Sequence, residues 1–425
     1  MIKKAGRITE VVYYDTTNFY FEIDEEDEDV LDECGNVIGY GMRKIGISKE
    51  ERKLPIVQMG LFMDQNGLPI LVEAFPGNTL DHLTLKHSLK NTIDGLDLSR
   101  FILIGDRGIC VYSNLVHLLD LGHGYIVSKS LLKSKAAERE WTYAEDGYTY
   151  IGDGFKYKSR IVEREVLDEN KNKRIITEKV LVYWSEDYAN RSKNENESYF
   201  KLLTKCSEST EAFKINRTQI KGIKRFLSKD ILNSDTGELF NSNELNALID
   251  LKKVEDFKRN FGYYQIITSE INMDDETIIE KYRSFTEIEN QFCIMKKTLE
   301  MRPFYVRNYD DIAAHLLTCV IALLLLCIIQ KKIRDSEINA SNITDKRKAK
   351  TKKKTPHWSM GMNFDRIQTA LENWKIEELS RQQYRFSNIR EGDIKILLDS
   401  FNIDIPLKLF SKMELLQIKK KIKVF

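Results

Sequence analysis

The sequence lacks the features that mark several common classes of protein. Its six cysteines form no CxxC pair and have no histidine at ligand spacing, which disfavours a zinc site and a secreted disulfide framework. The first residues contain no apolar stretch, so no signal peptide is expected. Lysine plus arginine (66) nearly balance aspartate plus glutamate (65), so any affinity for nucleic acid must come from how charge is distributed. We therefore expect a cytoplasmic protein with reduced thiols.

The sequence also shows no phosphate-binding loop and no histidine metal site. The turn Gly105-Asp106-Arg107-Gly108 lacks the Gly-Lys-Ser/Thr element of a phosphate loop. Four histidines fit no known ligand spacing, and we interpret them as surface or helix-end residues: His82, His87, His117 and His123. No repeat of fixed period is visible, which disfavours a solenoid or propeller.

The first 128 residues have the pattern of a mixed α/β domain. Asn66-Gly67 joins two apolar stretches, residues 55–63 and 68–75, and predicts a β-hairpin. The wholly apolar run at residues 101–104 is typical of a buried parallel strand. Further strands are predicted at residues 10–22, 38–44 and 124–128, and helices at 78–90 and 111–121. This order resembles an RNase H-like core, a mixed sheet flanked by helices.

The 425 residues suffice for two or three domains. The predicted divisions are a first core segment at residues 1–128, a β-rich insertion with helical segments at 129–274, a second core segment at 275–334, a basic linker at 335–355 and a helical tail at 356–425. Within the insertion, strands are predicted at 141–150, 155–165, 174–184 and 262–269, and helical structure at 198–250. One long helix at 274–299 and an apolar helix at 310–334 complete the core.

The apolar segment at residues 312–329 has two interpretations. Its eighteen residues reach the short limit for crossing a bilayer. A single such segment in an otherwise soluble chain is more often a fully buried core helix. We interpret it as a core helix and therefore expect no membrane attachment.

Three acidic residues stand where a metal-dependent nuclease would need them. Asp15 and Asp106 each follow an apolar, β-branched run, and Glu289 lies on a predicted helix. Magnesium prefers carboxylate oxygens and keeps several waters, so one or two carboxylates per ion suffice. Each aspartate alone is as well explained as a turn or cap residue at a strand end. The combination predicts a two-metal phosphoryl-transfer site.

The predicted glutamate helix carries two more polar residues at regular spacing. Tyr282, Glu289 and Lys296 are seven residues apart, so a continuous helix would place them on one face. The neighbouring face carries Ile288 and Phe292 and is predicted to pack against the core. A carboxylate between a phenol and an ammonium suits a metal site beside a DNA phosphate, although a solvent-exposed stripe explains the same spacing.

The segment at residues 282–298, followed by Leu299-Glu300-Met301-Arg302-Pro303, resembles the glutamate helix of bacterial insertion-sequence DDE transposases of the IS-four-like superfamily. That superfamily has an RNase H-like core, with a β-rich insertion between the second aspartate and the glutamate. The resemblance implies that Asp15, Asp106 and Glu289 are the catalytic metal ligands. They would hold two Mg²⁺ ions, for which Mn²⁺ can substitute.

The resemblance also implies the DNA contacts and the activity. Tyr282 and Lys296 would contact the DNA backbone; the signature's arginine position is Phe285 here, and Arg283 is the nearest guanidinium. The implied activity is DNA strand cleavage and strand transfer at the ends of an insertion sequence, with double-stranded DNA as partner and a homodimer as the DNA-bound form. The alternative is a catalytically inactive remnant that only binds DNA.

The N-terminal side of the chain departs from the superfamily pattern. Only fourteen residues precede Asp15, whereas these transposases usually carry a helical N-terminal region that recognises the terminal repeats. We expect either a truncated copy or the downstream half of an interrupted reading frame.

Overall fold

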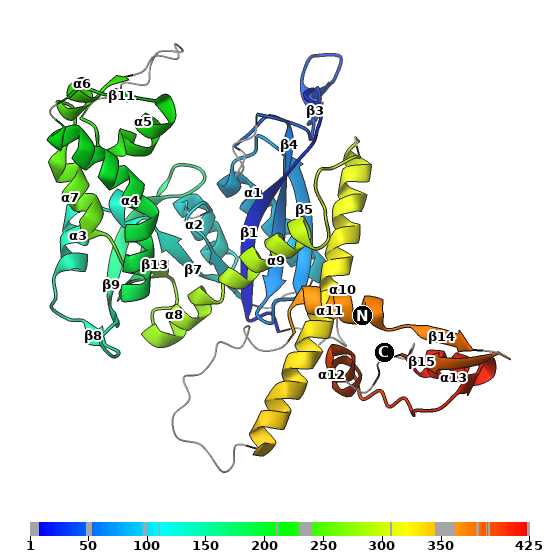
Figure 1. The fold of residues 1–425 in the computed structure, drawn as a ribbon. Helices are drawn as coiled ribbons and strands as arrows, with labels where there is room; N and C mark the ends of the chain where they lie inside the picture. Colours follow the sequence, from blue (N-terminus) through cyan, green and yellow to red (C-terminus); the bar gives the residue numbers. More distant parts are fainter. Residues whose placement is uncertain are drawn as a thin grey trace. The chain divides into compact units, whose positions relative to one another are not determined.

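The computed structural model describes residues 8–47, 53–96, 100–109, 111–209, 211–228, 240–306, 308–344, 362–379, 382–387, 389 and 392–422. The chain divides into two compact units, the first formed by Met1–His123 with Glu280–Phe425 and the second by Gly124–Ile279. The insertion predicted at residues 129–274 falls within the second unit. The protein is a mixed α/β structure in which sheet strands are flanked by helices (Figure 1).

The first unit contains four sheet strands in the order β5-β4-β1-β6. Their bounds are β1 Val11–Tyr20, β4 Ile56–Asp64, β5 Pro69–Pro76 and β6 Ile102–Gly105. β1 is antiparallel to β4 and parallel to β6, and β4 is antiparallel to β5. The predicted antiparallel start, hairpin and buried parallel strand are therefore confirmed.

The hairpin between β4 and β5 turns at Asn66-Gly67, as predicted. Gly67 has φ +79°, a left-handed conformation that glycine adopts without steric cost. The Asp64 carbonyl accepts from the Gly67 amide at 3.0 Å, and the Asp64 carboxylate accepts from the Leu68 amide at 2.9 Å. Asp64 therefore accepts hydrogen bonds from two amides of the turn, one through its carbonyl and one through its carboxylate.

The strand predicted at residues 38–44 is mostly wrong. β2 Val30–Leu31 and β3 Val37–Gly39 pair as a separate small hairpin, and Lys44 forms an isolated antiparallel bridge with Ile56 of β4. The Asp27 carboxylate accepts from the backbone amides of Met42 and Arg43. Because these amides bond to a side chain, they do not join a strand ladder.

Helices cover both faces of the β1–β4–β5 strands. Their bounds are α1 Asp81–Leu96, α2 Tyr112–Asp120, α8 Asp275–Arg283, α9 Thr286–Lys297 and α10 Tyr309–Thr344. The Tyr14 hydroxyl donates to Thr84 of α1, and the Phe19 ring, on the opposite face of β1, lies 5.7 Å from the Lys296 ammonium of α9. α1 and α9 therefore lie on opposite faces of β1 (Figure 1).

The single helix predicted at residues 274–299 is wrong, because α8 and α9 are separated at Ser284 and Phe285. The Ser284 hydroxyl donates to the Glu280 carbonyl at 3.0 Å, a contact that often bends a helix. The amides of Phe285 and Glu287 then bond to carbonyls three residues earlier rather than four. Local tightening thus breaks the helix without a proline or glycine.

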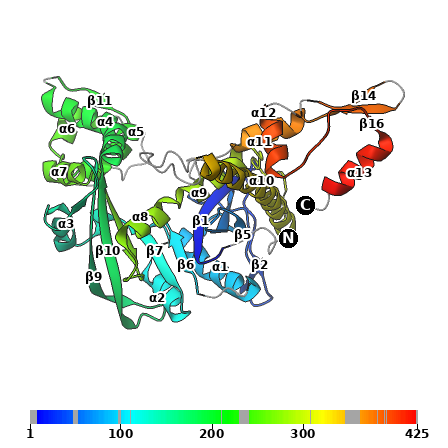
Figure 2. The same ribbon diagram turned by 90° about the horizontal axis from the view of Figure 1, so that it is seen from below.

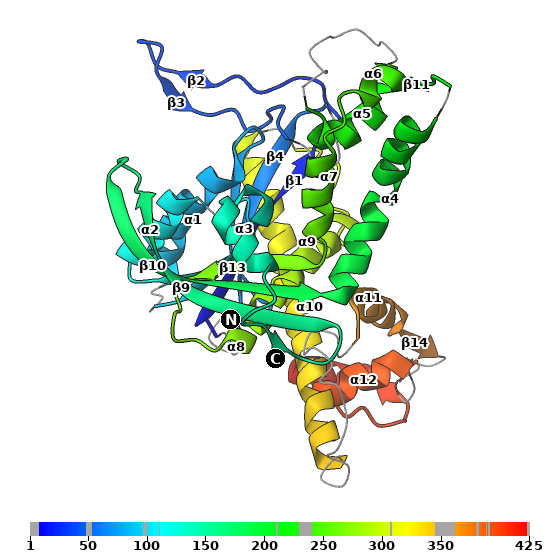
Figure 3. The same cartoon turned by 90° about the vertical axis from the view of Figure 1, so that its left-hand side faces the viewer.

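The C-terminal segment has its own small core and is mostly helical, as predicted, with three short strands among its helices. Its elements are α11 Phe364–Asn373, β14 Ile376–Leu379, β15 Gln383–Phe386, α12 Gly392–Ser400, β16 Phe410–Ser411 and α13 Lys412–Ile422. The three strands pair in the order β14-β15-β16. Figure 3 shows α11, α12 and β14 of this segment. The predicted linker overlaps α10 up to Thr344, and the rest of it lies outside the described residues.

Five of the second unit's strands lie side by side in the order β7-β13-β10-β9-β8. Their bounds are β7 Gly124–Lys129, β8 Thr149–Tyr150, β9 Phe155–Leu167, β10 Lys173–Ser185 and β13 Tyr263–Thr268. β9 and β10 form a long hairpin, visible in Figure 2. The strand predicted at 141–150 is mostly wrong, because Trp141 lies in α3 Ala136–Tyr143.

Helices form a separate cluster within the second unit. The elements here are α4 Glu186–Glu208, α5 Arg217–Ile223, η3 Lys224–Phe226, α6 Ser242–Asn246 and α7 Leu251–Arg259, with strands β11 Lys214–Ile215 and β12 Phe240–Asn241. The short helix η2 Leu131–Lys133 lies apart from them and contacts β13. The apolar core of the cluster includes Leu203, Ile220 and Phe226. The predicted helical stretch is confirmed, although it begins before residue 198.

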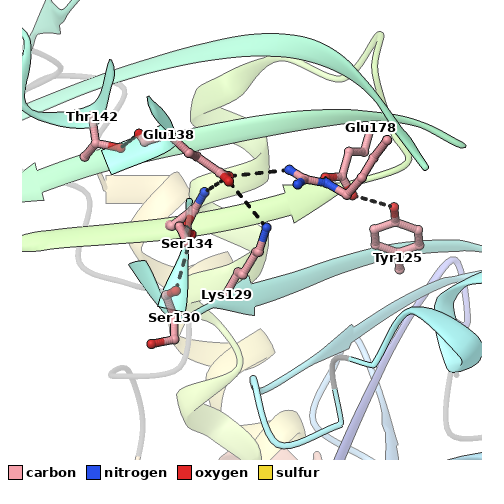
Figure 4. A network of polar contacts seen from close by, with 9 residues as sticks. Tyr125, Lys129, Ser130, Ser134, Glu138, Thr142 and Glu178 are labelled. Carbon is pink, nitrogen blue, oxygen red and sulfur yellow. Dashed lines mark hydrogen bonds and ion pairs between the residues drawn. The ribbon is translucent and has the colours of Figure 1, made fainter. Parts of the chain in front are cut away.

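A buried polar network joins the strands of the second unit (Figure 4). The Arg164 guanidinium of β9 donates to Glu178 of β10 at 2.5 Å and contacts Glu138 of α3 at 3.5 Å. Glu178 also accepts from the Tyr125 hydroxyl of β7 at 3.3 Å. The Lys129 ammonium lies 3.6 Å from Glu138. Opposite charges and hydrogen bonds thus compensate the buried carboxylates.

Candidate active site

The parallel pairing of β1 and β6 brings Asp15 and Asp106 to neighbouring positions. The register begins at Val11 opposite Ile102 and ends at Tyr14 opposite Gly105. The next residue on each chain is one of the two aspartates. Neighbouring strands lie about 5 Å apart, so the backbone places both carboxylate-bearing residues together at the end of β6.

Asp15 is half-buried within a strand that is otherwise mostly buried. Its Oδ1 accepts from the backbone amide of Thr16 at 2.7 Å. Burial raises the pKa of the preceding residue, Tyr14, and the negative charge of Asp15 acts in the same direction. The Tyr14 hydroxyl donates to Thr84 at 2.6 Å, which ties β1 to α1 immediately beside Asp15.

Asp106 is half-buried in the turn that follows β6. Its Oδ1 accepts from the Arg107 amide at 2.5 Å, and its carbonyl accepts from the Ile109 amide at 3.2 Å. The turn is tight, because a Cβ atom at Gly105 would lie 2.1 Å from Cδ1 of Ile109. These contacts hold the Asp106 carboxylate at the strand end.

α9 carries Glu289 along the face of β1 to which Asp15 belongs. Tyr13, Asp15 and Phe19 share that face, because side chains alternate along a strand. The Tyr13 hydroxyl donates to a backbone carbonyl near the end of α8 at 3.5 Å, and Phe19 lies beneath the Lys296 ammonium. The chain from α8 through α9 therefore runs in the direction of β1, and Glu289 lies between these two contacts.

Glu289 is exposed, whereas its helix packs through the adjacent face. The side chains of Ile288, Gln291, Phe292 and Met295 are buried. The prediction that this face belongs to the core is therefore confirmed. Glu289 is an accessible carboxylate at the edge of the packed body.

The predicted shared face of Tyr282, Glu289 and Lys296 is wrong, because Tyr282 lies in α8 and the other two in α9. Tyr282 is only 6% exposed, and its ring stacks on Phe285 with 6.0 Å between ring centres. Arg283 is exposed in the last turn of α8. Arg283 and Lys296 therefore remain the accessible cations among the predicted DNA contacts.

Glu287, two residues before Glu289, points into the packed body. Its Oε1 accepts from Gln291 at 3.0 Å, and its Cγ lies 3.3 Å from where a Cβ atom at Gly67 would be. Burial raises the pKa of Glu287, and the Arg334 guanidinium opposes that rise. The sequence carries no signal for this burial, because the packing partners come from the β4–β5 turn and from α10.

Within the described residues, no group of three or more His, Cys, Asp or Glu side chains is arranged to hold a metal ion. The donor set nevertheless fits magnesium chemically. Asp15, Asp106 and Glu289 offer only carboxylate oxygens, the donor type that Mg²⁺ takes with several retained waters. Two of them come from adjacent strand positions, and the third from a helix along the same face.

Comparison with known proteins shows only distant structural likeness. No protein-family model matches the chain, and no curated protein matches its sequence. Among solved structures, the chain is similar to a piggyBac transposase in a synaptic complex with hairpin DNA, with 7% identity and a TM-score of 0.38. The match covers 85% of this chain and 54% of that one, so the chain spans about half the length of that transposase. We therefore base the proposed function on this chain's own residues.

Proposed function

We propose that the chain is a DDE transposase with an RNase H-like catalytic core, related to the IS-four-like superfamily of bacterial insertion sequences. The observation that supports this proposal is the parallel register of β1 and β6, which makes Asp15 and Asp106 neighbours beside the helix of Glu289. On this proposal, three segments distant in sequence would supply carboxylates to one metal site. This is the arrangement that metal-assisted phosphoryl transfer requires.

In the proposed reaction, water attacks a DNA phosphodiester at the element end and breaks the bond from phosphorus to the 3′ oxygen. The freed 3′-hydroxyl then attacks a target phosphodiester, which joins the two DNAs and releases a target 3′-hydroxyl. Asp15, Asp106 and Glu289 would hold two magnesium ions, which when bound activate the attacking oxygen and stabilise the leaving oxygen. Arg283 and Lys296 would bind the phosphates that flank the cleaved bond.

The test is a cleavage assay of the purified chain on supercoiled plasmid with Mg²⁺ or Mn²⁺. The variants are Asp15→Ala, Asp106→Ala and Glu289→Ala. The matched control is Glu372→Ala, which removes an exposed helical glutamate from α11. We expect each of the three site variants to lose metal-dependent nicking, the control to keep it, and all four to keep the parent's melting temperature.

Two results would separate the alternatives. Equal nicking by the parent and all three site variants contradicts the proposal. A parent that binds DNA but does not nick it, with either metal, supports the inactive DNA-binding remnant instead. Binding is measured on the same plasmid fragments by mobility shift.

A further inference from the structure

The first turn of α1 carries a carboxylate that contacts both strands next to the proposed site. Oδ1 of Asp81 accepts from the Thr16 hydroxyl of β1 at 2.8 Å and from the Gln58 amide of β4. Asp81 is half-buried, and Gln58 is only 7% exposed. These bonds fix the Asp81 side chain between α1 and the sheet.

Thr16 links this carboxylate to Asp15. Its hydroxyl donates to Asp81, while its backbone amide donates to Oδ1 of Asp15 at 2.7 Å. Side chains alternate along β1, so Asp15 and Thr16 point to opposite faces. Asp81 therefore acts on Asp15 from the other side of the strand, through a single residue.

A second pair of hydrogen bonds secures the same turn of α1 on the other side of Asp15. The Tyr14 hydroxyl donates to Thr84 at 2.6 Å, and the Thr84 hydroxyl donates to the Asp81 carbonyl at 2.7 Å. Tyr14 can reach across because its partner strand has Gly60 there; a Cβ atom at Gly60 would lie 2.6 Å from the Tyr14 hydroxyl. Both residues that flank Asp15 are thus bonded to one helical turn.

Asp81 also lies close to the turn that carries Asp106. Its Oδ2 lies 3.2 Å from the position that a Cβ atom at Gly108 would take. Gly108 is two residues beyond Asp106, in the turn closed by the bond from the Ile109 amide to the Asp106 carbonyl. One side chain therefore contacts the strand of the first aspartate and lies close to the turn of the second.

We propose that Asp81 is a positioning residue, which fixes the separation of Asp15 and Asp106 through Thr16 and the turn at Gly108. This inference rests on the proposed function, because it concerns the same two carboxylates. Groups that hold metal ligands from outside commonly change metal affinity or activity about 10- to 100-fold when removed. Asp81 acts by accepting hydrogen bonds, so its negative charge is not required.

The test compares Asp81→Ala with Asp81→Asn, because asparagine keeps an oxygen that can accept from Thr16 and Gln58. Mn²⁺ binding to the full chain is measured by electron paramagnetic resonance, and the Mg²⁺ concentration for half-maximal nicking is measured in parallel. We expect Asp81→Ala to weaken Mn²⁺ binding about 10- to 100-fold. We expect Asp81→Asn to stay within about threefold of the parent. Melting temperatures show which variants remain folded.

A second pair of variants tests the link itself. Thr16→Val removes the hydroxyl at constant shape, and Thr16→Ser keeps it. We expect Thr16→Val to reproduce the loss in Asp81→Ala, the double variant to be no weaker than either single one, and Thr16→Ser to behave as the parent. If Asp81→Ala does not fold, Thr16→Val and Thr16→Ser still test the positioning role.

The outcomes distinguish the positioning role of Asp81 from the proposed metal-dependent function. If Asp15→Ala and Asp106→Ala abolish Mn²⁺ binding but Asp81→Ala and Thr16→Val bind as the parent does, the positioning role is overturned and the function stands. If Asp81→Asn is as weak as Asp81→Ala, the charge matters and positioning by hydrogen bonds is overturned. If Asp15→Ala binds Mn²⁺ as the parent does, the metal site and the inference both fall.

Discussion

Lys296 is a candidate DNA contact whose position is set by packing against an aromatic ring. Its ammonium lies 5.7 Å from the centre of the Phe19 ring, on the strand that carries Asp15. An ammonium over an aromatic face is attracted by the ring, and this holds a long, flexible side chain near one place. Lys297, the next residue, is exposed on another side of α9. The two lysines therefore differ in placement and not in charge.

This difference gives the first prediction. If Lys296 binds a DNA phosphate, Lys296→Ala lowers DNA affinity and reduces the slope of log affinity against log salt by about 1. Lys297→Ala is the matched control and leaves the slope nearer to that of the parent. Affinity is measured by fluorescence anisotropy over a salt series. Identical slopes for the two variants would remove Lys296 from the proposed DNA contacts.

Glu287 gives a prediction about stability and pH. Burial raises its pKa in the folded protein, so the folded state prefers the neutral carboxyl. Its contribution to the free energy of unfolding is greatest below the ordinary glutamate pKa of about 4.3 and is lost as pH rises through the raised value. Glu287→Gln imitates the neutral form. It should therefore raise the melting temperature at about pH 8 and match the parent at about pH 4.

The control for this prediction has the same local geometry at the surface. Glu287 accepts from Gln291 four residues later, and exposed Glu372 accepts from Gln368 four residues earlier. Glu372→Gln should change the melting temperature little at either pH, because an exposed carboxylate is solvated in both states. A Glu287→Gln variant that is less stable than the parent at pH 8 would mean that its pairing with Arg334 outweighs its burial.

Helices and strands could be predicted where their formation depends on residues close together in the sequence. The hairpin at Asn66-Gly67 and the strand at residues 101–104 could be predicted because turn chemistry and an apolar run act within a few residues. The break between α8 and α9 could not, because Ser284 has no strong helix-breaking signal. Trp141 was assigned to a strand by its aromatic neighbours, yet it lies in α3 over β9.

The stability of the second unit's sheet is expected to depend on the Arg164 guanidinium. The side chain of its partner Glu178 is fully buried. Arg164→Ala would leave that charge with less compensation, which typically costs about 3–5 kcal/mol of unfolding free energy. The control is Arg385→Ala, since Arg385 and Glu377 are both about half exposed and such pairs contribute about 0–1 kcal/mol. Equal losses in urea denaturation would contradict this account.

Across the whole molecule, the candidate site residues could be predicted from the sequence, but the arrangement of the segments that carry them could not. Asp15, Asp106 and Glu289 could each be named from local context. The neighbouring backbone positions of Asp15 and Asp106 depend on the register of β1 with β6, and the position of Glu289 depends on the path of α9 along β1. Both are set by contacts between distant segments. Asp81 was not singled out, because an aspartate in the first turn of a helix is ordinary there.

α10 packs against β5, α9, α11 and α12 of the first unit. Its buried residues Ile312, Leu316 and Leu323 recur at helical spacing, while Leu317 and Leu325 remain 53% and 45% exposed. Near its C-terminal end, Ile333 enters the apolar core of the C-terminal segment. By length and composition alone, residues 309–336 are also long and apolar enough to cross a membrane. Only 28% of its most apolar stretch is buried, so the expectation of a fully buried core helix is wrong. The buried stripe packs against the first unit, and the choice between a core helix and a membrane span stays a prediction.

Two leucines on α10 decide between these interpretations. Leu323 is completely buried in the protein, so Leu323→Ala should cost about 2–5 kcal/mol of unfolding free energy. Leu325→Ala removes the same atoms from a half-exposed site on the same helix and should cost far less. The parent should also remain in the soluble fraction of lysed cells without detergent. If the helix crosses a bilayer, the protein will sediment with membranes. Leu323→Ala and Leu325→Ala will then no longer differ in their loss of unfolding free energy, because lipid would surround the outer face of the helix.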